Sequence, residues 1–282
     1  MPELPEVETV RRGLEARTEG FQIVRVQVCR NRAIASPKDP LAFVAGLKHC
    51  SVHNWRRRGK YLLASLQQPN GEPGGHWGVH LRMTGQFLWL EEPMDPCPHT
   101  RVRFWNAEGS ELRFQDVRSF GEMWWVPPEK ELSSVIGGLK RLGPEPFSNE
   151  FTAEYLLRRL SGSRRSIKTA LLDQSLVAGV GNIYADETLF KARLRPDLNS
   201  GDLLPTQLSN LREALLDVLA ASIGVGGTTF SDFRDLTGRN GNYGGQAWVY
   251  RRGGQGCRIC GTTIRRDRLA GRSTHWCPKC QS

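Results

Sequence analysis

The first residues of the chain carry the period of an amphipathic helix. Four apolar residues recur at spacings of three and four and therefore share one helix face: Leu4, Val7, Val10 and Leu14. Pro5 suits a first helical turn, where its missing amide hydrogen costs nothing, and the glutamates nearby suit the positive end of the helix dipole. The pattern predicts a helix over residues 2–17.

Between about residues 21 and 127, apolar and polar positions alternate with the period of β-strands. Val24, Val26 and Val28 show this alternation, and further strand-like runs follow. These runs cover Lys60–Leu66, Val79–Leu90, Arg101–Trp105, Glu111–Val117 and Glu122–Val126. The proline- and glycine-rich residues 69–75 predict a loop. Strands without interleaved helices predict an antiparallel sandwich or barrel.

The period becomes helical after a linker at residues 142–147. One expected helix opens at Thr152 and Glu154, and others cover Ile167–Leu172, Asn182–Ala192 and Leu208–Ile223. A glycine-rich stretch over residues 224–245 then leads into a cysteine-rich tail. We expect a multidomain α+β fold, with an N-terminal antiparallel β-sandwich carrying an N-terminal helix, a helical domain, and a small cysteine-held module.

The composition is that of a globular protein, with 39% hydrophobic and 24% charged residues among 282. No apolar run approaches the roughly 20 residues that a membrane span needs, so we expect no membrane partner. The acidic N-terminus lacks the layout of a signal peptide, which predicts a cytoplasmic, nucleoid-associated protein.

The net charge of +10 is unevenly spread along the chain. Residues 251–282 hold seven arginines and one lysine against one aspartate. Such a tail is typical of a protein that binds a polyanion, most simply nucleic acid. A solvated basic tail is the alternative that composition alone leaves open.

Four of the seven cysteines form two close pairs, Cys257 with Cys260 and Cys277 with Cys280. Paired CxxC turns, an odd cysteine total and a reducing compartment argue against disulfides. Four thiolates satisfy a tetrahedral Zn²⁺ ion and leave no position open for a substrate, so the sequence predicts one structural zinc. About 30 residues cannot bury a useful core, and the metal must therefore supply folding free energy.

Four arginines lie between the two cysteine pairs: Arg265, Arg266, Arg268 and Arg272. Their placement favours a β-hairpin pressed against phosphates. A zinc ribbon with a solvated basic face is the alternative reading of this segment.

The segment Gly179-Val-Gly-Asn182 separates two helical stretches. Glycines permit a tight turn, and Asn182 would cap the next helix, whose free N–H groups can receive a phosphate. An ordinary helix hairpin with the same caps is the alternative.

The N-terminus is a third candidate site. Removal of Met1 would give Pro2 a free secondary amine, which can attack an electrophilic carbon when partly desolvated. Glu3 is adjacent and Glu6 lies one turn along the same face. A carboxyl group beside an amine nucleophile suits glycosidic cleavage through a Schiff base. The alternative is that these glutamates only complement the helix dipole.

Together these features resemble the formamidopyrimidine-DNA glycosylases, within the wider family that includes endonuclease VIII. The resemblance spans the whole chain, at residues 1–9 (MPELPEVET), 58–62 (RGKYL), 80–85 (HLRMTG), 116–121 (DVRSFG), 172–174 (LDQ), 177–187 (VAGVGNIYADE), 226–229 (GGTT) and a finger ending in Cys280 and Gln281. Leu4 favours the formamidopyrimidine class, since the endonuclease VIII class usually has glycine there.

The resemblance implies four parts of the chain and their roles. They are a catalytic β-sandwich at 1–135, a linker at 136–150, a helix–two-turn–helix domain with a lesion-closing loop at 151–245, and a zinc finger at 246–282. The implied partner is damaged double-stranded DNA, bound by a monomer.

The resemblance also implies the catalytic residues. Pro2 would be the Schiff-base nucleophile at the deoxyribose C1′, and Glu3 the proton donor and acceptor during sugar opening, with Glu6 supporting the helix. Lys60 matches the lysine assigned to β-elimination. Arg272 matches the finger arginine associated with δ-elimination and with gripping the phosphates around the lesion.

Further matches concern DNA contacts. Met83, Arg118 and Phe120 match the residues that fill the space left by a flipped base, although Met83 and Phe120 also suit an ordinary core. The residues expected to hold backbone phosphates are His99, Arg164, Lys168 and Asn182. Residues 228–246 match the loop that closes over the flipped base.

The implied function is a bifunctional glycosylase and AP lyase of base excision repair that removes oxidised purines (8-oxoguanine and formamidopyrimidines) through a Schiff base at Pro2 and then cleaves the strand by β,δ-elimination. The alternatives are an endonuclease VIII-like enzyme for oxidised pyrimidines and a non-enzymatic zinc-ribbon DNA-binding protein, which has no need of a free N-terminal amine. Arg195-Pro196 stands where the family often has His-Pro, and residues 235–246 are unusually rich in glycine and asparagine. The second departure leaves lesion preference open.

Overall fold

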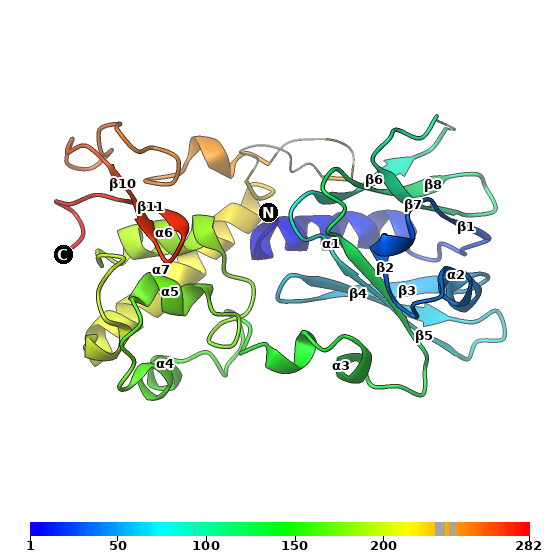
Figure 1. The fold of residues 1–282 in the computed structure, drawn as a ribbon, viewed down its shortest axis with the longest axis horizontal. Helices are drawn as coiled ribbons and strands as arrows, with labels where there is room; N and C mark the ends of the chain where they lie inside the picture. Colours follow the sequence, from blue (N-terminus) through cyan, green and yellow to red (C-terminus); the bar gives the residue numbers. More distant parts are fainter. Residues whose placement is uncertain (93, 229–234, 237, 239–240) are drawn as a thin grey trace. The chain divides into compact units, whose positions relative to one another are not determined.

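The computed structural model describes residues 1–282 apart from 93, 229–234, 237 and 239–240. The chain forms two compact units, whose elements are labelled in Figure 1. The first unit comprises Met1–Lys140 and Gly226–Asn242, and the second comprises Arg141–Val225 and Tyr243–Ser282. The chain therefore leaves the second unit after residue 225 and returns to it at residue 243.

The predicted N-terminal helix is present as α1 (Leu4–Thr18). Its apolar stripe is buried, with Leu4, Val7, Val10 and Leu14 each at most 1% exposed. Pro5 lies in the first turn, as expected from its missing N–H. The helix packs against strands β3 and β4 of the first unit.

The first sheet has five strands in the order β2-β9-β5-β4-β3. Their bounds are Ile34–Ser36 (β2), Glu122–Val126 (β9), Pro73–His80 (β5), Tyr61–Gln67 (β4) and Ser51–Arg58 (β3). Every neighbouring pair is antiparallel except β2 with β9, which is parallel. The expectation of a wholly antiparallel sandwich is therefore wrong at this one edge.

The second sheet has four antiparallel strands in the order β1-β7-β8-β6. Their bounds are Arg25–Val28 (β1), Thr100–Trp105 (β7), Glu111–Asp116 (β8) and Gly85–Leu90 (β6). Trp77 of the first sheet and Phe104 of the second lie with ring centroids 4.4 Å apart, and both side chains are fully buried. The two sheets thus face each other across one core, to which α1 contributes, and the predicted sandwich is confirmed.

Three further sequence expectations fail within this unit. The run 79–90 is not one strand, because β5 ends at His80 and a tight turn through residues 81–84 precedes β6, with the Gly85 N–H donating to the Leu81 carbonyl at 2.9 Å. A helix also interrupts the strands at α2 (Pro40–Leu47), whose N-terminus is capped by the Asp39 carboxylate accepting from the Leu41 N–H at 3.0 Å. Strand β5 begins at Pro73, inside the segment expected to be a loop.

The helices of the second unit lie close to their predicted positions. They are α4 (Ala153–Leu160), α5 (Ile167–Leu172), α6 (Asn182–Lys191) and α7 (Pro205–Gly224). The finger hairpin consists of β10 (Arg265–Leu269) and β11 (Arg272–Trp276). The short remaining helices are α3 (Leu132–Val135) and 3-10 turns at Asn31–Ala33, Leu139–Arg141, Ser200–Asp202 and Tyr243–Gly245. Among the described residues, no helix is both long and apolar enough to cross a membrane.

Residues 173–181 join α5 to α6 through two successive turns. The Gln174 side chain braces them, donating to the Val180 carbonyl at 2.8 Å and accepting from the Gly179 N–H at 2.9 Å. Gly179 has a φ of 91°, a conformation that favours glycine. One amide side chain thus fixes the direction in which α6 begins.

Candidate active site and nucleic-acid interface

The N-terminus combines an exposed first residue with buried functional groups behind it. Met1 is 49% exposed, whereas Pro2 is buried and Glu3 is 3% exposed. The Pro2 nitrogen is bonded to Met1 in this chain and becomes an amine only when Met1 is removed.

Glu6 connects this terminus to a distant segment of the first unit. One of its carboxylate oxygens accepts from the Glu3 N–H at 2.8 Å and the other accepts from the Thr228 N–H at 2.7 Å. Glu6 is 1% exposed, so both hydrogen bonds are shielded from water. The carboxylate therefore orients the start of α1 and holds the root of the glycine-rich segment 226–242 against it.

Lys60 lies in the turn between β3 and β4, immediately after Gly59. Gly59 has a φ of 55°, which explains a glycine at this position. Arg57 donates to the Gly59 carbonyl at 3.0 Å and contacts Glu8 of α1 at 3.3 Å. Lys60 itself is only 7% exposed. The turn that carries Lys60 is thus tied to the helix that begins beside Pro2.

Met83, Arg118 and Phe120 lie together on the surface of the first unit. An Arg118 guanidinium nitrogen is 3.0 Å from the Met83 sulfur, and its central carbon lies 5.0 Å from the centre of the Phe120 ring. Met83 is 39% exposed and Phe120 is 40% exposed, which rules out the core reading of both residues. Two exposed apolar side chains beside an arginine can replace a base in a DNA stack.

Asp116 holds the two loops that carry these residues. Its Oδ1 accepts from the Thr84 hydroxyl and, at 3.2 Å, from the Arg118 N–H. Its Oδ2 accepts from the Gly121 N–H at 2.6 Å. Asp116 is 1% exposed and the sequence analysis gave it no role. The signal was an acidic residue at a strand end, two residues before the exposed Arg118, but its partners become visible only in the fold.

His80 shapes the neighbouring turn. Its Nδ1 accepts from the Arg82 N–H at 2.9 Å, and Arg82 adopts a φ of 54°. Burial, together with the charges of Arg82 and Lys60, lowers the pKa of His80 to about 3. The imidazole is therefore neutral at physiological pH, as an acceptor nitrogen must be.

The expected phosphate-binding residues differ in exposure. His99 and Arg164 are exposed, in the first and second units respectively. Lys168 is only 1% exposed and forms an ion pair with Asp186 at 2.6 Å. The structure therefore directs the Lys168 ammonium group into the protein interior and away from solvent.

Asn182 also differs from its expected position. It is the first residue of α6 rather than its cap, because the residue with extended backbone is Gly181. Its side-chain amide donates to the Ser273 carbonyl of β11 at 3.0 Å. The prediction of an asparagine cap is wrong, since a contact with the finger hairpin takes up the side chain.

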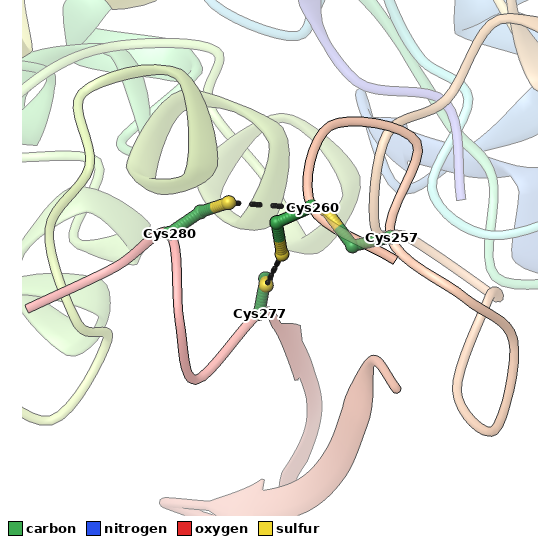
Figure 2. A group of neighbouring side chains, drawn as sticks. All are labelled: Cys257, Cys260, Cys277 and Cys280. Atoms are coloured by element: carbon green, nitrogen blue, oxygen red, sulfur yellow. Dashed lines mark hydrogen bonds between the residues drawn. The ribbon is translucent and has the colours of Figure 1, made fainter. Parts of the chain in front are cut away.

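The four predicted metal ligands converge, and Figure 2 shows their sulfur atoms facing a common centre. The Sγ atoms of Cys257 and Cys280 are 3.9 Å apart, and those of Cys260 and Cys277 are 3.5 Å apart. A tetrahedron with Zn–S bonds of about 2.3 Å has sulfur–sulfur edges of about 3.8 Å. The observed spacing fits a zinc ion bound by four thiolates.

The finger rests on the helical part of the second unit. Its apolar contacts form a small cluster of Phe190, Val249, Ile264, Cys257 and Cys277. Glu187 of α6, which is fully buried, accepts from the backbone N–H groups of Trp248, Val249 and Tyr250 at 2.8–2.9 Å. Burial raises the pKa of Glu187, and these hydrogen bonds oppose that shift. The sequence analysis missed this role, although two adjacent acids in a predicted helix were visible.

The remaining expectations concern the finger arginines and the closing loop. Arg272 is exposed at the start of β11, and Arg265 lies over the Trp276 ring with 5.5 Å between guanidinium carbon and ring centre. Arg195, which stands where the family often has histidine, lies over the same ring, with 5.3 Å between its guanidinium carbon and the ring centre. Residues 229–234, 237 and 239–240 of the predicted closing loop lie outside the described residues.

Three family models match the chain in order. They are the formamidopyrimidine-DNA glycosylase N-terminal domain at residues 1–123, the formamidopyrimidine-DNA glycosylase H2TH domain at 142–234, and the zinc finger found in FPG and IleRS at 254–282. Together they span most of both units.

Whole-chain relatives agree with these models. The chain is 68% identical to the formamidopyrimidine-DNA glycosylase of Parasynechococcus marenigrum (strain WH8102) and 62% identical to that of Prochlorococcus marinus (strain MIT 9313), with 100% of each chain covered. A solved complex of a Lactococcus lactis FPG mutant with Fapy-dG-containing DNA matches with a TM-score of 0.89, 32% identity and 100% coverage of both chains. The L. lactis Fpg complex with abasic-site DNA matches with a TM-score of 0.88, 32% identity and 99% coverage of both chains. The chain belongs to the formamidopyrimidine-DNA glycosylase family.

Proposed function

We propose that this protein is a bifunctional DNA glycosylase and AP lyase of base excision repair, which excises 8-oxoguanine and formamidopyrimidines from duplex DNA. The observation that carries the proposal is the N-terminus. Pro2 follows an exposed Met1, and the backbone of the adjacent Glu3 is held by the buried Glu6. A protein that only binds DNA has no need of an oriented amine at that position.

The chemistry follows from a secondary amine beside a carboxyl group. After loss of Met1, the Pro2 nitrogen attacks C1′ of the damaged nucleotide, and the electron pair of the glycosidic bond leaves with the base, which takes up a proton. Glu3 donates a proton to O4′ as the C1′–O4′ bond opens. The product is an iminium ion that joins the Pro2 nitrogen to C1′.

The iminium ion then permits cleavage of the strand. Loss of a proton from C2′ breaks the C3′–O bond, and loss of a proton from C4′ breaks the C5′–O bond, so that phosphate leaves on each side. We assign Lys60 to the first elimination and Arg272 to the second. Hydrolysis of the remaining iminium ion restores the Pro2 amine.

Met83, Arg118 and Phe120 would occupy the space of the flipped base. Unstacking a base costs a few kcal/mol, which the inserted side chains partly offset. Arg118 can donate hydrogen bonds to the base left without a partner. The mutual contacts of these residues and their exposure support the assignment.

Cys257, Cys260, Cys277 and Cys280 would hold one zinc ion, which supplies folding free energy to the finger and takes no part in the reaction. His99, Arg164, Arg272 and the backbone N–H of Asn182, the first residue of α6, would contact backbone phosphates on the damaged duplex. We place the protein on nucleoid DNA as a monomer.

Borohydride trapping tests this proposal. Borohydride reduces the iminium ion to a stable amine, so wild-type protein should become covalently linked to 8-oxoguanine duplex. Pro2→Gly should reduce the trapping rate on the order of 10²-fold, because a primary amine on a flexible glycine replaces the secondary amine that the proline ring orients. Pro40→Gly, which alters a first-turn proline of another helix, serves as the control. Protein with Met1 retained should not be trapped, and efficient trapping of that form would refute Pro2 as the nucleophile.

Oxidised pyrimidines are a second substrate class for the same experiment. A solved structure of L. lactis FPG, 32% identical to this chain, holds DNA that contains an oxidised pyrimidine. Excision of 8-oxoguanine opposite cytosine faster than that of thymine glycol supports our assignment, and the reverse order supports the endonuclease VIII-like alternative.

A further inference from the structure

We infer that Lys168 and Asp186 form a buried clamp that positions the finger hairpin and its Arg272, and that Lys168 does not itself bind DNA phosphate. The inference rests on the proposed function for the role of Arg272. The contacts that support it all lie within the second unit.

The clamp is a buried ion pair. Lys168 of α5 and Asp186 of α6 are each 1% exposed, and the Lys168 Nζ lies 2.6 Å from the Asp186 Oδ1. A lysine ammonium group has three N–H donors. The other two are directed to the Ser273 carbonyl at 2.8 Å and to the Thr274 hydroxyl at 2.9 Å. Two hydrogen bonds and the ion pair with Asp186 thus surround the ammonium group with protein partners, and its charge is compensated without a phosphate.

Asp186 extends the clamp along β11. Its second oxygen accepts from the His275 N–H at 2.9 Å and lies 3.1 Å from the His275 Nδ1. Asn182, one turn earlier on α6, donates to the same Ser273 carbonyl at 3.0 Å. Three consecutive residues of the strand, 273–275, are thus held by side chains from two helices.

Arg272 is the residue immediately before this held segment. It is exposed at the first position of β11, next to the tip formed by Ala270 and Gly271. A hairpin is otherwise free to pivot about its zinc-bound base, because the four cysteines lie at the opposite end from the tip. Fixing residues 273–275 therefore limits the positions that the Arg272 guanidinium can reach.

The Asp186→Asn variant gives opposite predictions for the two roles of Lys168. If Lys168 bound phosphate, Asp186→Asn would remove a competing anion and strengthen DNA binding. If the pair is a clamp, Asp186→Asn loosens β11 and weakens binding, just as Lys168→Met does. Lys168→Met leaves the buried Asp186 carboxylate without its counter-charge and can therefore prevent folding. In that case Asp186→Asn and Lys168→Arg, which keep the size or the charge of the side chain, still test the clamp.

The experiment measures affinity for a duplex that contains a stable abasic analogue, using the full zinc-loaded chain. We expect Asp186→Asn and Lys168→Met each to weaken binding about tenfold, with one zinc per chain retained. In an Arg272→Ala background the same changes should have little further effect on affinity. If the clamp acts through Arg272, the effects of breaking the clamp and of removing Arg272 are not additive. Lys191→Met, which breaks an exposed ion pair with Asp217, serves as the control and should bind normally.

Salt dependence gives a second readout. A lost phosphate contact lowers the slope of log affinity against log salt concentration by about one, whatever the state of Arg272. Tighter binding by Asp186→Asn, or a full slope change on Lys168→Met in the Arg272→Ala background, would overturn the clamp. Absence of borohydride trapping in the wild-type protein would instead refute the proposed function, so the two failures are distinguishable.

Discussion

His80 shows how a single buried side chain sets the shape of the loop that carries Met83. Its Nδ1 accepts a hydrogen bond from the Arg82 N–H, and Arg82 adopts a left-handed backbone conformation that few residues favour. A protonated imidazole has no acceptor nitrogen, so this hydrogen bond requires the neutral form. Burial enforces that form by lowering the pKa of His80 to about 3.

The depressed pKa predicts a loss of stability in mild acid. In the unfolded chain His80 takes up a proton near the ordinary histidine pKa of about 6.5, whereas in the folded chain it does not. The contribution of neutral His80 to the free energy of unfolding is therefore complete above pH 6.5 and is lost progressively toward pH 3. Between pH 6.5 and 5.5 this one group should remove about 1 kcal/mol from the free energy of unfolding.

Urea unfolding at those two pH values checks the prediction. In the His80→Asn variant the side-chain oxygen can still accept from the Arg82 N–H, but the side chain does not titrate. Its free energy of unfolding should therefore fall about 1 kcal/mol less than that of the wild type between the two pH values. Comparison of the two proteins cancels the contribution of the other acidic groups. Equal losses in both would show that His80 titrates normally in the folded state.

Asp116 marks the limit of sequence reasoning at the scale of residues. The motif that contains it also holds Arg118 and Phe120, which are exposed and contact each other on the surface. The carboxylate itself has no distinguishing pattern, because its donors at residues 84, 118 and 121 come from two separate loops. Long-range hydrogen bonds of this kind depend on how strands pair, which local periodicity does not determine.

At the scale of elements, periodicity located the helices of the second unit well. Residues 167–172 form α5 as predicted, and α6 and α7 end within one residue of their expected limits. These helices bury one apolar face, which leaves a clear mark on the sequence. Helix α2 was missed because it is short and mostly apolar, although Asp39 followed by Pro40 is a capping signal.

The root of the closing loop gives a prediction about an element. Gly227 has a φ of 79°, and a Cβ added there would lie 3.0 Å from the Glu6 Oε1 and 3.3 Å from its Cα. Gly227→Ala should therefore push residues 226–228 away from α1 and weaken the hydrogen bond from the Thr228 N–H. We expect excision of 8-oxoguanine to slow about tenfold, since these contacts require a shift of a few tenths of an ångström and a misplacement of about 1 Å costs on the order of 10²-fold.

A neighbouring glycine provides the matched control. Gly226 has almost the same φ, 78°, but a Cβ there would meet nothing within 4 Å. Gly226→Ala carries the backbone strain of about 1–2 kcal/mol without the contact with Glu6. Single-turnover excision rates for both variants separate the two effects. Equal rates would mean that strain alone, and not the contact with Glu6, governs the loop.

At the scale of the molecule, the proposed reaction draws on residues of both units. Pro2, Glu3, Lys60 and the Met83 cluster belong to the first unit, whereas Arg272 and the four cysteines belong to the second. The first unit and the zinc finger differ in what stabilises them. The first has a large core shared by two sheets and α1, while the finger has only a small apolar cluster beside its cysteines.

This difference predicts a selective response to loss of zinc. Cys277→Ser should release the metal and disorder the finger, because about 30 residues cannot fold on so small a core. The finger's Trp276 should become accessible to a soluble fluorescence quencher, whereas Trp55 and Trp77 of the first unit should stay shielded because they are buried in its core. Cys50→Ser, at an equally buried cysteine outside the cluster, should keep its zinc.

The same variant separates binding from chemistry. Without the finger, the chain loses the Arg272 contact and most of a tail that holds seven arginines, so affinity for DNA should fall at least tenfold and the salt dependence should become shallower. Pro2 and Glu3 remain in place in the first unit, and borohydride trapping should therefore recover at high concentrations of protein and DNA. If trapping stays absent at saturating DNA, zinc must also support the catalytic unit itself. Metal analysis, fluorescence and trapping on one preparation distinguish these cases.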